Sequence, residues 1–412
     1  MNAKEFLLDA GFLIKDSVYE EMEYAIVGEM KKGLAGEGGL PMLSSYLPVT
    51  RVREHQNVIV LDVGGTNLRT ALVAVAPGQP VQVKHLTTLP TPGTQGPMTR
   101  ETFFAAIAET LRPIAGASDR IGLCFSFACD ILPDRDARVL YLDKQLQVTG
   151  LTGTLVGEGL REAMASLGLP HDHRITVLND TVAALLGAVA TDPTPFYDGY
   201  IGMILGTGFN CCYNEANTLV TKDKVLQSRP GRFLMNTECG GFTGFPITDI
   251  DRKVHAACAD GAKNALEKAL SGAYQGPLLT ELLKAAAAEG VFHADVIPTV
   301  TAKDACDFLL HPDAPGVLHD LCPDPVPVLQ LTRGMIHRAS CLVAVTLRAI
   351  LRRGYMGLRA PACLAVEGTT FWRNTVLRES IMRRVVSGGR TIKLVSVEDA
   401  NLAGAAAAAL AD

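Results

Sequence analysis

Two short glycine-containing turns are the parts of this sequence whose residue types could hold a phosphate. The first, Gly-Gly-Thr-Asn at residues 64–67, interrupts the apolar stretch VIVLDVGGTNLRTALVAV over residues 58–75. The second, Gly-Thr-Gly at residues 206–208, interrupts YIGMILGTGFNCCY over residues 200–213. Glycine accepts positive φ and leaves backbone N–H groups uncovered, and a concave row of such groups binds anions. The β-forming residues in both pairs of arms predict two β-hairpins.

The repetition of this turn favours phosphate binding over simpler interpretations. One such turn alone is equally typical of an ordinary hairpin. The first turn lacks the third glycine and the following helix of a dinucleotide fingerprint, and it lacks the Gly-Lys-Ser/Thr of a P-loop. Two hairpins of this kind on one chain predict two similar halves that grip one polyphosphate between them.

Four ionisable side chains are candidates for the chemistry, since phosphoryl transfer needs positioning, charge stabilisation and a base for the attacking hydroxyl. Asp180 follows a short apolar strand and can project from its end as a base, or serve with its neighbours as a helix N-cap. Lys144 is a candidate cation beside the transferred group, or a solvated surface lysine. Glu238 could bind sugar hydroxyls or cap a loop, and Glu267 could do the same or lie on a helix surface.

Carboxylates that face one polyol also raise a glycosidase alternative, in which an acid and a nucleophile are paired. Glycoside hydrolysis gives no reason for two glycine–threonine hairpins. The residues therefore favour phosphoryl transfer to an alcohol.

Length and charge bound the class of protein. The chain has 412 residues, of which 48% are hydrophobic, so it can form two large lobes with cores of their own. Its formal net charge is −5, charged residues make up 20%, and like charges do not cluster. This balance argues against nucleic acid or an anionic membrane as the main partner.

Cysteine usage and the N-terminal sequence indicate a cytoplasmic protein. The ten cysteines include no Cys-x-x-Cys pair, which predicts reduced, buried thiols. Glu5 and Asp9 interrupt the first apolar residues, so this segment predicts an amphipathic helix and not a signal peptide. The sequence contains no run of about 18 apolar residues, so no membrane span is expected.

The elements that must position these residues alternate between strand and helix. Beyond the two hairpins, strands are predicted at residues 120–128, 175–178, 362–366 and 391–395. Helices are predicted within residues 1–50, from Thr99, over residues 151–167, after Thr181, through much of 247–351 and from Glu398. Interleaved strands and helices over this length indicate an α/β protein.

Taken in order, the motifs resemble the hexokinase/glucokinase family of sugar kinases. They lie at residues 30–34, 42–47, 61–69, 125–127, 178–182, 205–210, 236–240, 266–276, 338–351, 367–369 and 397–405. The resemblance implies the duplicated actin-like ATPase (ribonuclease H-like) fold, with two lobes and a central cleft. The small lobe would comprise residues 52–178 plus 399–412, and the large lobe residues 1–51 plus 179–398.

The resemblance also implies the residues that bind the sugar. They would be Ser126, Phe127, Asp143, Lys144, Asn179, Asp180, Asn210, Glu238 and Glu267. Asp180 would take the proton from the 6-hydroxyl, and Lys144 would stand near the transferred phosphoryl group as the second catalytic residue. The implied substrate is a hexose, with glucose expected first and mannose or fructose as alternatives.

The implied nucleotide is ATP with Mg²⁺. Its contacts would be Asp62, Gly64, Gly65, Thr66, Asn67, Arg69, Gly206, Thr207, Gly368 and Thr369. Asp62 would orient the metal through water, because hard cations of this size tend to keep water ligands. The expected product is hexose 6-phosphate, made by a monomer or a homodimer.

Some positions depart from the family pattern. Ala128 replaces a proline, Asp143 a threonine and Cys239 an aromatic residue around the sugar motifs. Glu367 replaces an aspartate, a small polar pair is lost at residues 336–337, and residues 400–403 lack Gly-Ser-Gly. These changes bear on the sugar and adenine contacts, so a catalytically weak sugar sensor or regulator stays open as an alternative function.

Overall fold

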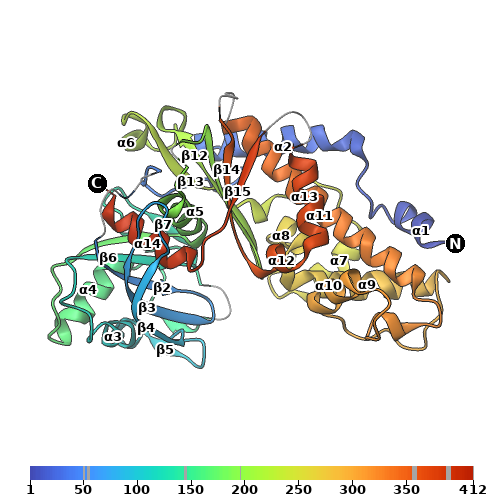
Figure 1. Ribbon diagram of the computed structural model, residues 1–412, viewed down its shortest axis with the longest axis horizontal. Coiled ribbons are helices and arrows are strands. Elements are labelled where there is room, and N and C mark those ends of the chain that lie inside the picture. The colour runs from blue at the N-terminus through green and yellow to red at the C-terminus, as the bar shows by residue number, and fades with distance from the viewer. Residues whose placement is uncertain are drawn as a thin grey trace.

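A computed structural model of the protein describes residues 1–49, 52, 56–142, 146–194, 196–354, 360–386 and 391–411. Two mixed sheets form its framework, and helices surround them (Figure 1). Figure 1 shows α3 and α4 near the first sheet at one end of the molecule, with α7 to α13 toward the other end. The predicted division into a small and a large lobe at residues 178 and 398 stays a prediction.

The first sheet has five strands in the order β10-β6-β2-β3-β4. Its strands are β2 (Val58–Val63), β3 (Asn67–Ala74), β4 (Gln82–Pro90), β6 (Arg120–Phe125) and β10 (Arg174–Leu178). β2 and β3 pair antiparallel as the first predicted hairpin, whereas β2, β6 and β10 run parallel to one another. Every residue of β2 is buried, as expected for a continuous apolar strand that is covered on both faces.

The second sheet has six strands in the order β1-β13-β12-β11-β14-β15. Its strands are β1 (Leu43–Ser44), β11 (Gly199–Leu205), β12 (Phe209–Ala216), β13 (Arg232–Asn236), β14 (Ala362–Glu367) and β15 (Ile392–Val395). β11 and β12 form the second predicted hairpin, and β14 lies parallel to β11. Two small pairs join β5 (Met98–Thr99) to β9 (Val148–Thr149) and β7 (Cys129–Ile131) to β8 (Ala137–Val139).

The α-helices cover the sheets and connect them. They are α1 (Ala3–Asp9), α2 (Tyr19–Ala35), α3 (Arg100–Thr110), α4 (Val156–Ser166), α5 (Asp180–Thr191), α6 (Lys224–Gln227), α7 (Asp249–Ala257), α8 (Ala265–Leu270), α9 (Gly272–Ala288), α10 (Ala302–Leu310), α11 (Val326–Gly354), α12 (Thr369–Arg373), α13 (Thr375–Val386) and α14 (Ala400–Leu410). Short 3₁₀ turns lie at η1 (Asp16–Val18), η2 (Asn217–Leu219), η3 (Cys239–Gly241) and η4 (His319–Leu321). α3 begins directly after Thr99, as predicted, and the side chain of Thr99 caps it.

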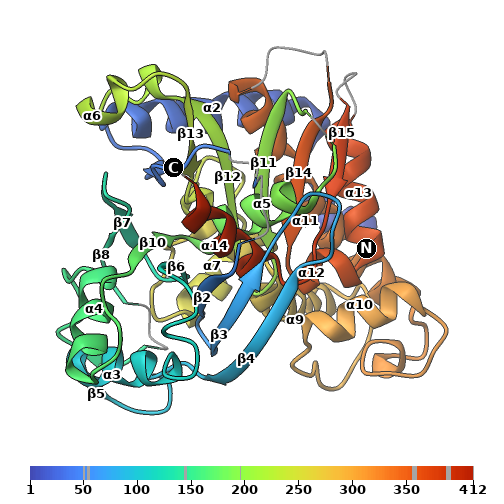
Figure 2. The same cartoon turned by 60° about the vertical axis from the view of Figure 1, so that its left-hand side comes forward.

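Helices α5 and α14 pack closely against each other (Figure 2). A Cβ on Gly404 would lie 1.8 Å from the carbonyl oxygen of Ala183, and one on Gly187 would lie 2.3 Å from that of Ala400. The alanine-rich sequences of both helices leave their backbones almost in contact. α14 also packs on β2, β6 and β10, so this helix pair fixes the base from which Asp180 projects.

The long helix α11 lies in the core. It is long and apolar enough to cross a membrane by length and composition, but 89% of its most apolar window is buried inside the protein. α11 packs against α1, α2, α8, α9 and α13. We therefore describe α11 as a core helix.

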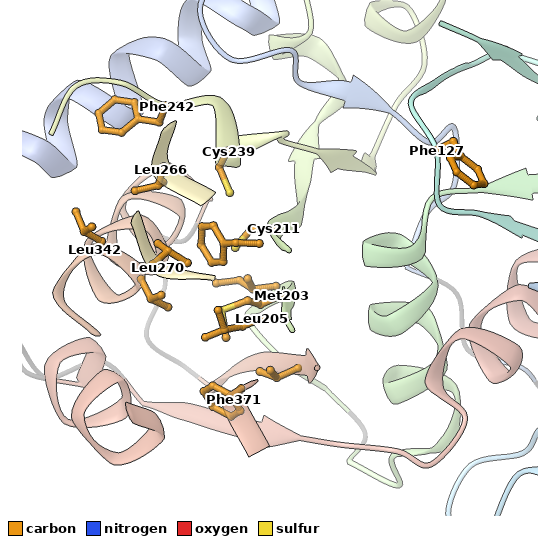
Figure 3. Packing of buried hydrophobic residues seen from close by; sticks show 14 of the residues in the cluster. Phe127, Met203, Leu205, Cys211, Cys239, Phe242, Leu266, Leu270, Leu342 and Phe371 are labelled. Atoms are coloured by element: carbon orange, nitrogen blue, oxygen red, sulfur yellow. The ribbon is translucent and has the colours of Figure 1, made fainter. Parts of the chain in front are cut away.

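A hydrophobic cluster lies directly behind the second glycine turn (Figure 3). Met203 and Leu205 of β11, Cys211 of β12, Leu270 of α8 and Leu342 of α11 are all at most 2% exposed. Burial of each large apolar side chain stabilises the fold by about 1.5–3 kcal/mol. The turn at the end of β11 therefore cannot shift without disturbing this packing.

Candidate active site

Three parallel strands end at the same edge of the first sheet and place the first group of predicted residues there. Asp62 of β2 lies opposite Cys124 of β6, and Cys124 lies opposite Leu178 of β10. Ser126 continues from β6 and donates its backbone N–H to Val63 at 3.1 Å. Ligands of open α/β sheets bind at the carboxyl ends of the strands. Asp62, Ser126 and the Asn-Asp pair that follows Leu178 all lie at this edge.

The second sheet repeats this arrangement with its own parallel pair. Ile204 of β11 is in register with Glu367 of β14, so the turns that follow the two strands are neighbours. A Cβ on Gly206 would lie 3.3 Å from the Cα of Gly368. The N–H of Gly272, at the start of α9, donates to the Gly206 carbonyl at 2.8 Å. Residues far apart in the sequence thus enclose one turn.

Tolerance of positive φ is not what these turns require of most of their glycines. Gly64, Gly206 and Gly208 do not adopt a positive φ. Gly208 is required for close approach, because its Cβ would lie 2.8 Å from Oε2 of Glu267. Gly368 does combine a positive φ of 122° with a close backbone approach to the second turn.

Asp180 is the first residue of helix α5, and the predicted N-cap lies at its neighbour Asn179. Asn179 is the N-cap, and its Oδ1 accepts the N–H of Thr181 at 2.9 Å. Asp180 accepts the same N–H through Oδ1 at 2.7 Å, and its Oδ2 makes no hydrogen bond to the described residues. Burial, followed by the charge of Glu238, raises the pKa of Asp180 to about 7. Such a carboxylate can accept a proton near neutral pH.

A network of two amides orients Glu238. The side-chain amide of Asn236 donates to Oε1 of Glu238 at 2.6 Å, and that of Asn210 donates to the same oxygen at 3.2 Å. The Asn210 amide also donates to Oδ1 of Asn236 at 2.7 Å. Burial raises the pKa of Glu238, although these two hydrogen bonds favour its ionised form. The sequence prediction omitted Asn236, although it stands two residues before Glu238 in the same motif.

The backbone of Glu238 is itself unusual. Its φ of 53° and ψ of 40° place it in the left-handed region that non-glycine residues rarely adopt. Such conformations cost about 1–3 kcal/mol and cluster at functional sites. The amide network and this conformation together fix where the carboxylate points.

Glu267 belongs to the same cluster, so its alternative as a helix-surface charge was wrong. Its Oε2 accepts the backbone N–H of Phe209 at 2.8 Å, directly after the second glycine turn. Burial raises the pKa of Glu267, and the charge of Glu238 adds to this effect. The charge of Glu238 thus raises the pKa values of both Asp180 and Glu267, and three such acceptors can bind the hydroxyl groups of a polyol.

Asp62 and Arg69 form a second polar group. Arg69 donates to Oδ2 of Asp62 at 2.6 Å through Nη2, and its Nη1 lies 3.0 Å from Oδ1 of Asp399. Oδ1 of Asp62 is buried and has no hydrogen-bond partner of ordinary geometry among the described residues. This free acceptor fits a water molecule of a hydrated Mg²⁺.

The donor set also limits how a metal could bind. The described residues contain no group of three or more His, Cys, Asp or Glu side chains that could hold a metal ion. A cation beside Asp62 would therefore take most of its ligands from water and from a phosphate-bearing substrate.

Other predicted residues have less specific surroundings. Phe127 is buried and packs against Phe125 with ring centroids 5.1 Å apart, away from the cluster of Cys211 and Cys239 (Figure 3).

The predicted nucleotide contacts of the first turn are held by backbone hydrogen bonds. The carbonyl oxygen of Thr66 accepts the N–H of Thr91, and that of Asn67 accepts the N–H of Gly64 across the turn. Burial raises the pKa of Glu367, while Arg69 opposes the shift. Asp143 and Lys144 lie outside the described residues.

Sequence comparison identifies relatives along most of the chain. Two sequence models of the family described as hexokinase match residues 7–189 and 200–309. Hexokinase-2, chloroplastic, from Nicotiana tabacum is 31% identical over 66% of this chain and 57% of its own length. Hexokinase-1 from Arabidopsis thaliana is 29% identical over 73% of this chain and 62% of its own length. The matches to these two thus span less than two thirds of each relative. Hexokinase-7 from Oryza sativa subsp. japonica is 28% identical over 92% of this chain and 89% of its own length.

Solved structures with the same fold confirm the predicted fold class. A hexokinase from Schistosoma mansoni complexed with glucose superposes with a TM-score of 0.79 at 22% identity, over 100% of both chains. A ROK family glucokinase from Streptomyces griseus, complexed with glucose and AMPPNP, gives a TM-score of 0.52 at 17% identity over 86% of this chain and 99% of that one. The architecture is the α/β actin-like ATPase fold of these kinases. With both family segments in order along this fold, the chain belongs to the hexokinase family.

Proposed function

We propose that this protein transfers the terminal phosphoryl group of ATP to the 6-hydroxyl of a hexose, with glucose as the first candidate. Membership of the hexokinase family supports the reaction class. The products would be hexose 6-phosphate and ADP. The observation that carries the proposal is the position of Asp180 at the end of β10, a carboxylate whose pKa is raised to about 7 by burial and then by the charge of Glu238.

In this proposal the carboxylate cluster binds the hexose, and Asp180 takes up the proton of the attacking hydroxyl. Asn210, Glu238 and Glu267 accept or donate hydrogen bonds to the other hydroxyls, while Asn236 holds Glu238 in place. General-base catalysis typically contributes 10²- to 10⁴-fold in rate. Because burial raises the pKa of Asp180 toward neutrality, the group is basic enough to accept a proton and still ionised in part at pH 7.

The glycine turns would hold the nucleotide's phosphates through backbone N–H groups. Asp62 and Arg69 lie at the end of the first hairpin, where Oδ1 of Asp62, which has no hydrogen-bond partner among the described residues, would receive a water of the metal. Mg²⁺, when bound with ATP, neutralises charge on the transferred group. Gly206 and Gly368 would line the opposite side of the phosphates.

A coupled assay with ATP, Mg²⁺ and a panel of glucose, mannose, fructose and glucosamine tests the proposal. Hexose-dependent release of ADP supports the kinase. The sensor alternative is motivated by the altered adenosine region, in which Ile336 is an apolar, buried residue. Sugar binding without turnover would support the sensor and contradict the kinase.

The pH dependence of the reaction should follow the ionisation of Asp180. Its carboxylate must be deprotonated to accept a proton, so kcat/KM for the hexose should rise with pH and level off above about 7. Initial rates at saturating ATP between pH 5.5 and 8.5 measure this profile. A rate that stays flat down to pH 5.5 would contradict the raised pKa.

The same shift predicts the stability of an Asp180→Asn variant. The pKa is raised from 3.8 in the unfolded chain to about 7, so the folded protein favours the protonated acid. The stability that this group contributes is complete below pH 3.8 and is lost as the pH rises through about 7. Asparagine cannot ionise, so the variant should be more stable than the natural protein by roughly 1–4 kcal/mol at pH 8. Thermal unfolding at pH 8 and pH 4 measures the difference, which should fall to less than about 1 kcal/mol at the lower pH.

Asn236→Ala should selectively weaken hexose binding. The change removes the shorter of the two amide hydrogen bonds to Glu238, which corresponds to about 1–3 kcal/mol and a roughly tenfold rise in the hexose KM. The KM for ATP should stay within twofold. Asn217→Ala is the matched control, since this buried side-chain amide, in the turn η2 that follows β12, donates to the carbonyl of Pro230. Equal effects of both variants on the hexose KM would contradict the role of Asn236.

A further inference from the structure

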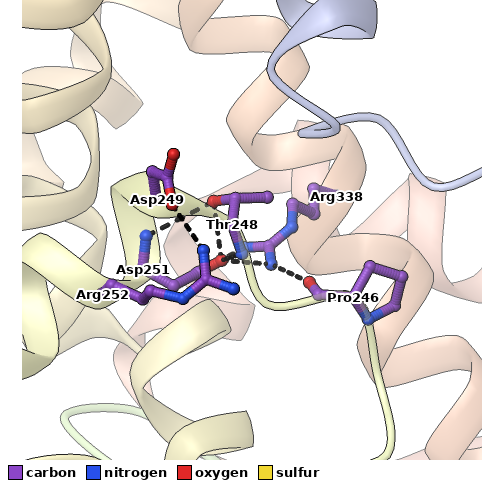
Figure 4. Close-up of polar contacts among 6 residues, drawn as sticks. All are labelled: Pro246, Thr248, Asp249, Asp251, Arg252 and Arg338. Atoms are coloured by element: carbon purple, nitrogen blue, oxygen red, sulfur yellow. Dashed lines mark hydrogen bonds and ion pairs between the residues drawn. The ribbon is translucent and has the colours of Figure 1, made fainter.

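Arg338 is a buried charged residue that the proposed reaction does not use. It lies on α11, is 1% exposed, and is the largest fully buried side chain among the described residues. Its guanidinium group donates to both oxygens of Asp251, at 2.9 and 2.8 Å, and Asp251 is also 1% exposed (Figure 4). Phe12 and Phe245 lie over the guanidinium with ring centroids 4.8 and 5.8 Å away.

Asp251 and Arg338 together fix the end of one loop. Arg338 donates to the carbonyl oxygen of Pro246 at 2.9 Å, and Oδ2 of Asp251 accepts the N–H and hydroxyl of Thr248 at 2.7 and 2.8 Å. Figure 4 shows these contacts meeting between the start of α7 and the long helix. The ion pair therefore holds the last residues before α7 against α11.

The other end of this loop carries Glu238. Thr237 anchors it to β12, because its hydroxyl donates to the carbonyl of Cys211 at 2.7 Å. Gly240 packs so closely that a Cβ there would lie 3.2 Å from the Cβ of Glu267. Between the two anchors, Phe242 and Phe245 are buried with their rings stacked at 6.5 Å.

Two anchors are needed because Glu238 adopts a left-handed conformation. A residue with a φ of 53° keeps that conformation only while the surrounding structure over-determines it. A buried ion pair is weak evidence for stability, since apolar residues of similar volume often replace one without loss. Nε of Arg338 is buried without a hydrogen-bond partner among the described residues, which further argues against a purely stabilising role.

We propose that Arg338, through Asp251 and Pro246, is a positioning residue for Glu238 and so sets affinity for the hexose. The proposal rests on the proposed kinase function and adds a determinant outside the substrate contacts. Loss of the ion pair would let the loop relax, and Glu238 would leave the orientation in which it meets a sugar hydroxyl. ATP binding would change much less, because Arg338 bonds to Asp251 and Pro246, at the end of the loop away from the second glycine turn in the sequence.

Two variants of the full chain test this inference. Arg338→Lys keeps the charge but loses the bidentate contact, and Arg338→Met with Asp251→Leu replaces the pair by apolar residues. The double change avoids leaving a buried, unpaired carboxylate, which would itself destabilise the protein. For both variants we expect the hexose KM to rise at least tenfold while the ATP KM stays within twofold. The double variant should unfold within a few degrees of the natural protein.

Arg348→Lys is the matched control on the same helix. Arg348 pairs at 2.5 Å with Glu23, which is 1% exposed, but this pair joins α11 to α2 and not to the loop. The control should leave the hexose KM unchanged. The inference is overturned if the hexose KM does not rise in the double variant, or if both substrates' KM values rise equally in all the variants. A natural protein without hexose-dependent turnover would instead overturn the proposed function and this inference with it.

Discussion

Replacement of Asp180 by alanine is expected to lower kcat by 10²- to 10⁴-fold while hexose binding stays measurable. The carboxylate lies at the start of α5, where Oδ1 accepts the N–H of Thr181. Oδ2 makes no hydrogen bond to the described residues and can therefore face a substrate hydroxyl. Removal of a general base costs this range of rate, whereas Glu238 and Glu267 keep their hydrogen bonds to the protein. Steady-state rates and calorimetric titration of glucose measure the two effects separately.

Asp192→Ala provides the control for this experiment. Asp192 stands at the opposite end of α5, where it accepts hydrogen bonds from Thr194 and Lys393. Its loss should lower the thermal stability but change kcat less than threefold. Near-normal turnover of the Asp180 variant would remove Asp180 from the role of base.

Gly368→Ala is expected to lower kcat/KM for ATP by about 100-fold. The new Cβ would lie 2.3 Å from the carbonyl oxygen of Leu205 and 2.6 Å from the N–H nitrogen of Gly206, and both of these are backbone atoms. The φ of 122° adds strain for any residue with a side chain. The second glycine turn must therefore shift, and a misplacement of about 1 Å at a site can cost 10²-fold. The hexose KM, measured at saturating ATP, should change much less.

Gly290→Ala is the control that separates the steric clash at Gly368 from the strain of a positive φ. Gly290 also has a positive φ, of 70°, but a Cβ added there would meet no atom of the described residues within 4 Å. This variant should lose about 1 kcal/mol of stability, as expected for alanine in the left-handed region, and keep its kinetics. If both glycine variants lower kcat/KM for ATP equally, the close contact between Gly368 and the second turn does not explain the effect of Gly368→Ala.

Local sequence patterns predicted the elements near the site because each pattern has a local physical cause. The apolar run of β2 and the glycine turn that follows it predicted the first hairpin, and the sequence around Thr99 and Glu101 predicted the start of α3. Asp180 was placed correctly at the junction of β10 and α5, since the apolar strand and the Asn-Asp-Thr cap adjoin in sequence.

Contacts between distant segments could not be predicted in this way. Glu267 fits a helix surface in its own segment, and only the fold brings Phe209 to within 2.8 Å of its carboxylate. Asn236 was missed because the sequence does not show that its side chain turns toward Glu238, where Asn210 of the neighbouring strand bonds to both of them. The glycines of the second turn were predicted as part of a phosphate-binding hairpin, but their close packing against Glu267 and Gly368 could not be seen in the sequence.

A structure of the protein with glucose and a non-hydrolysable ATP analogue tests the central claim most directly. The account predicts that the carboxylate of Asp180 lies within hydrogen-bond distance of the sugar's 6-hydroxyl, with the terminal phosphate between the turns that contain Gly65 and Gly206. A hexose bound with its 6-hydroxyl away from Asp180, or phosphates remote from both turns, would contradict it.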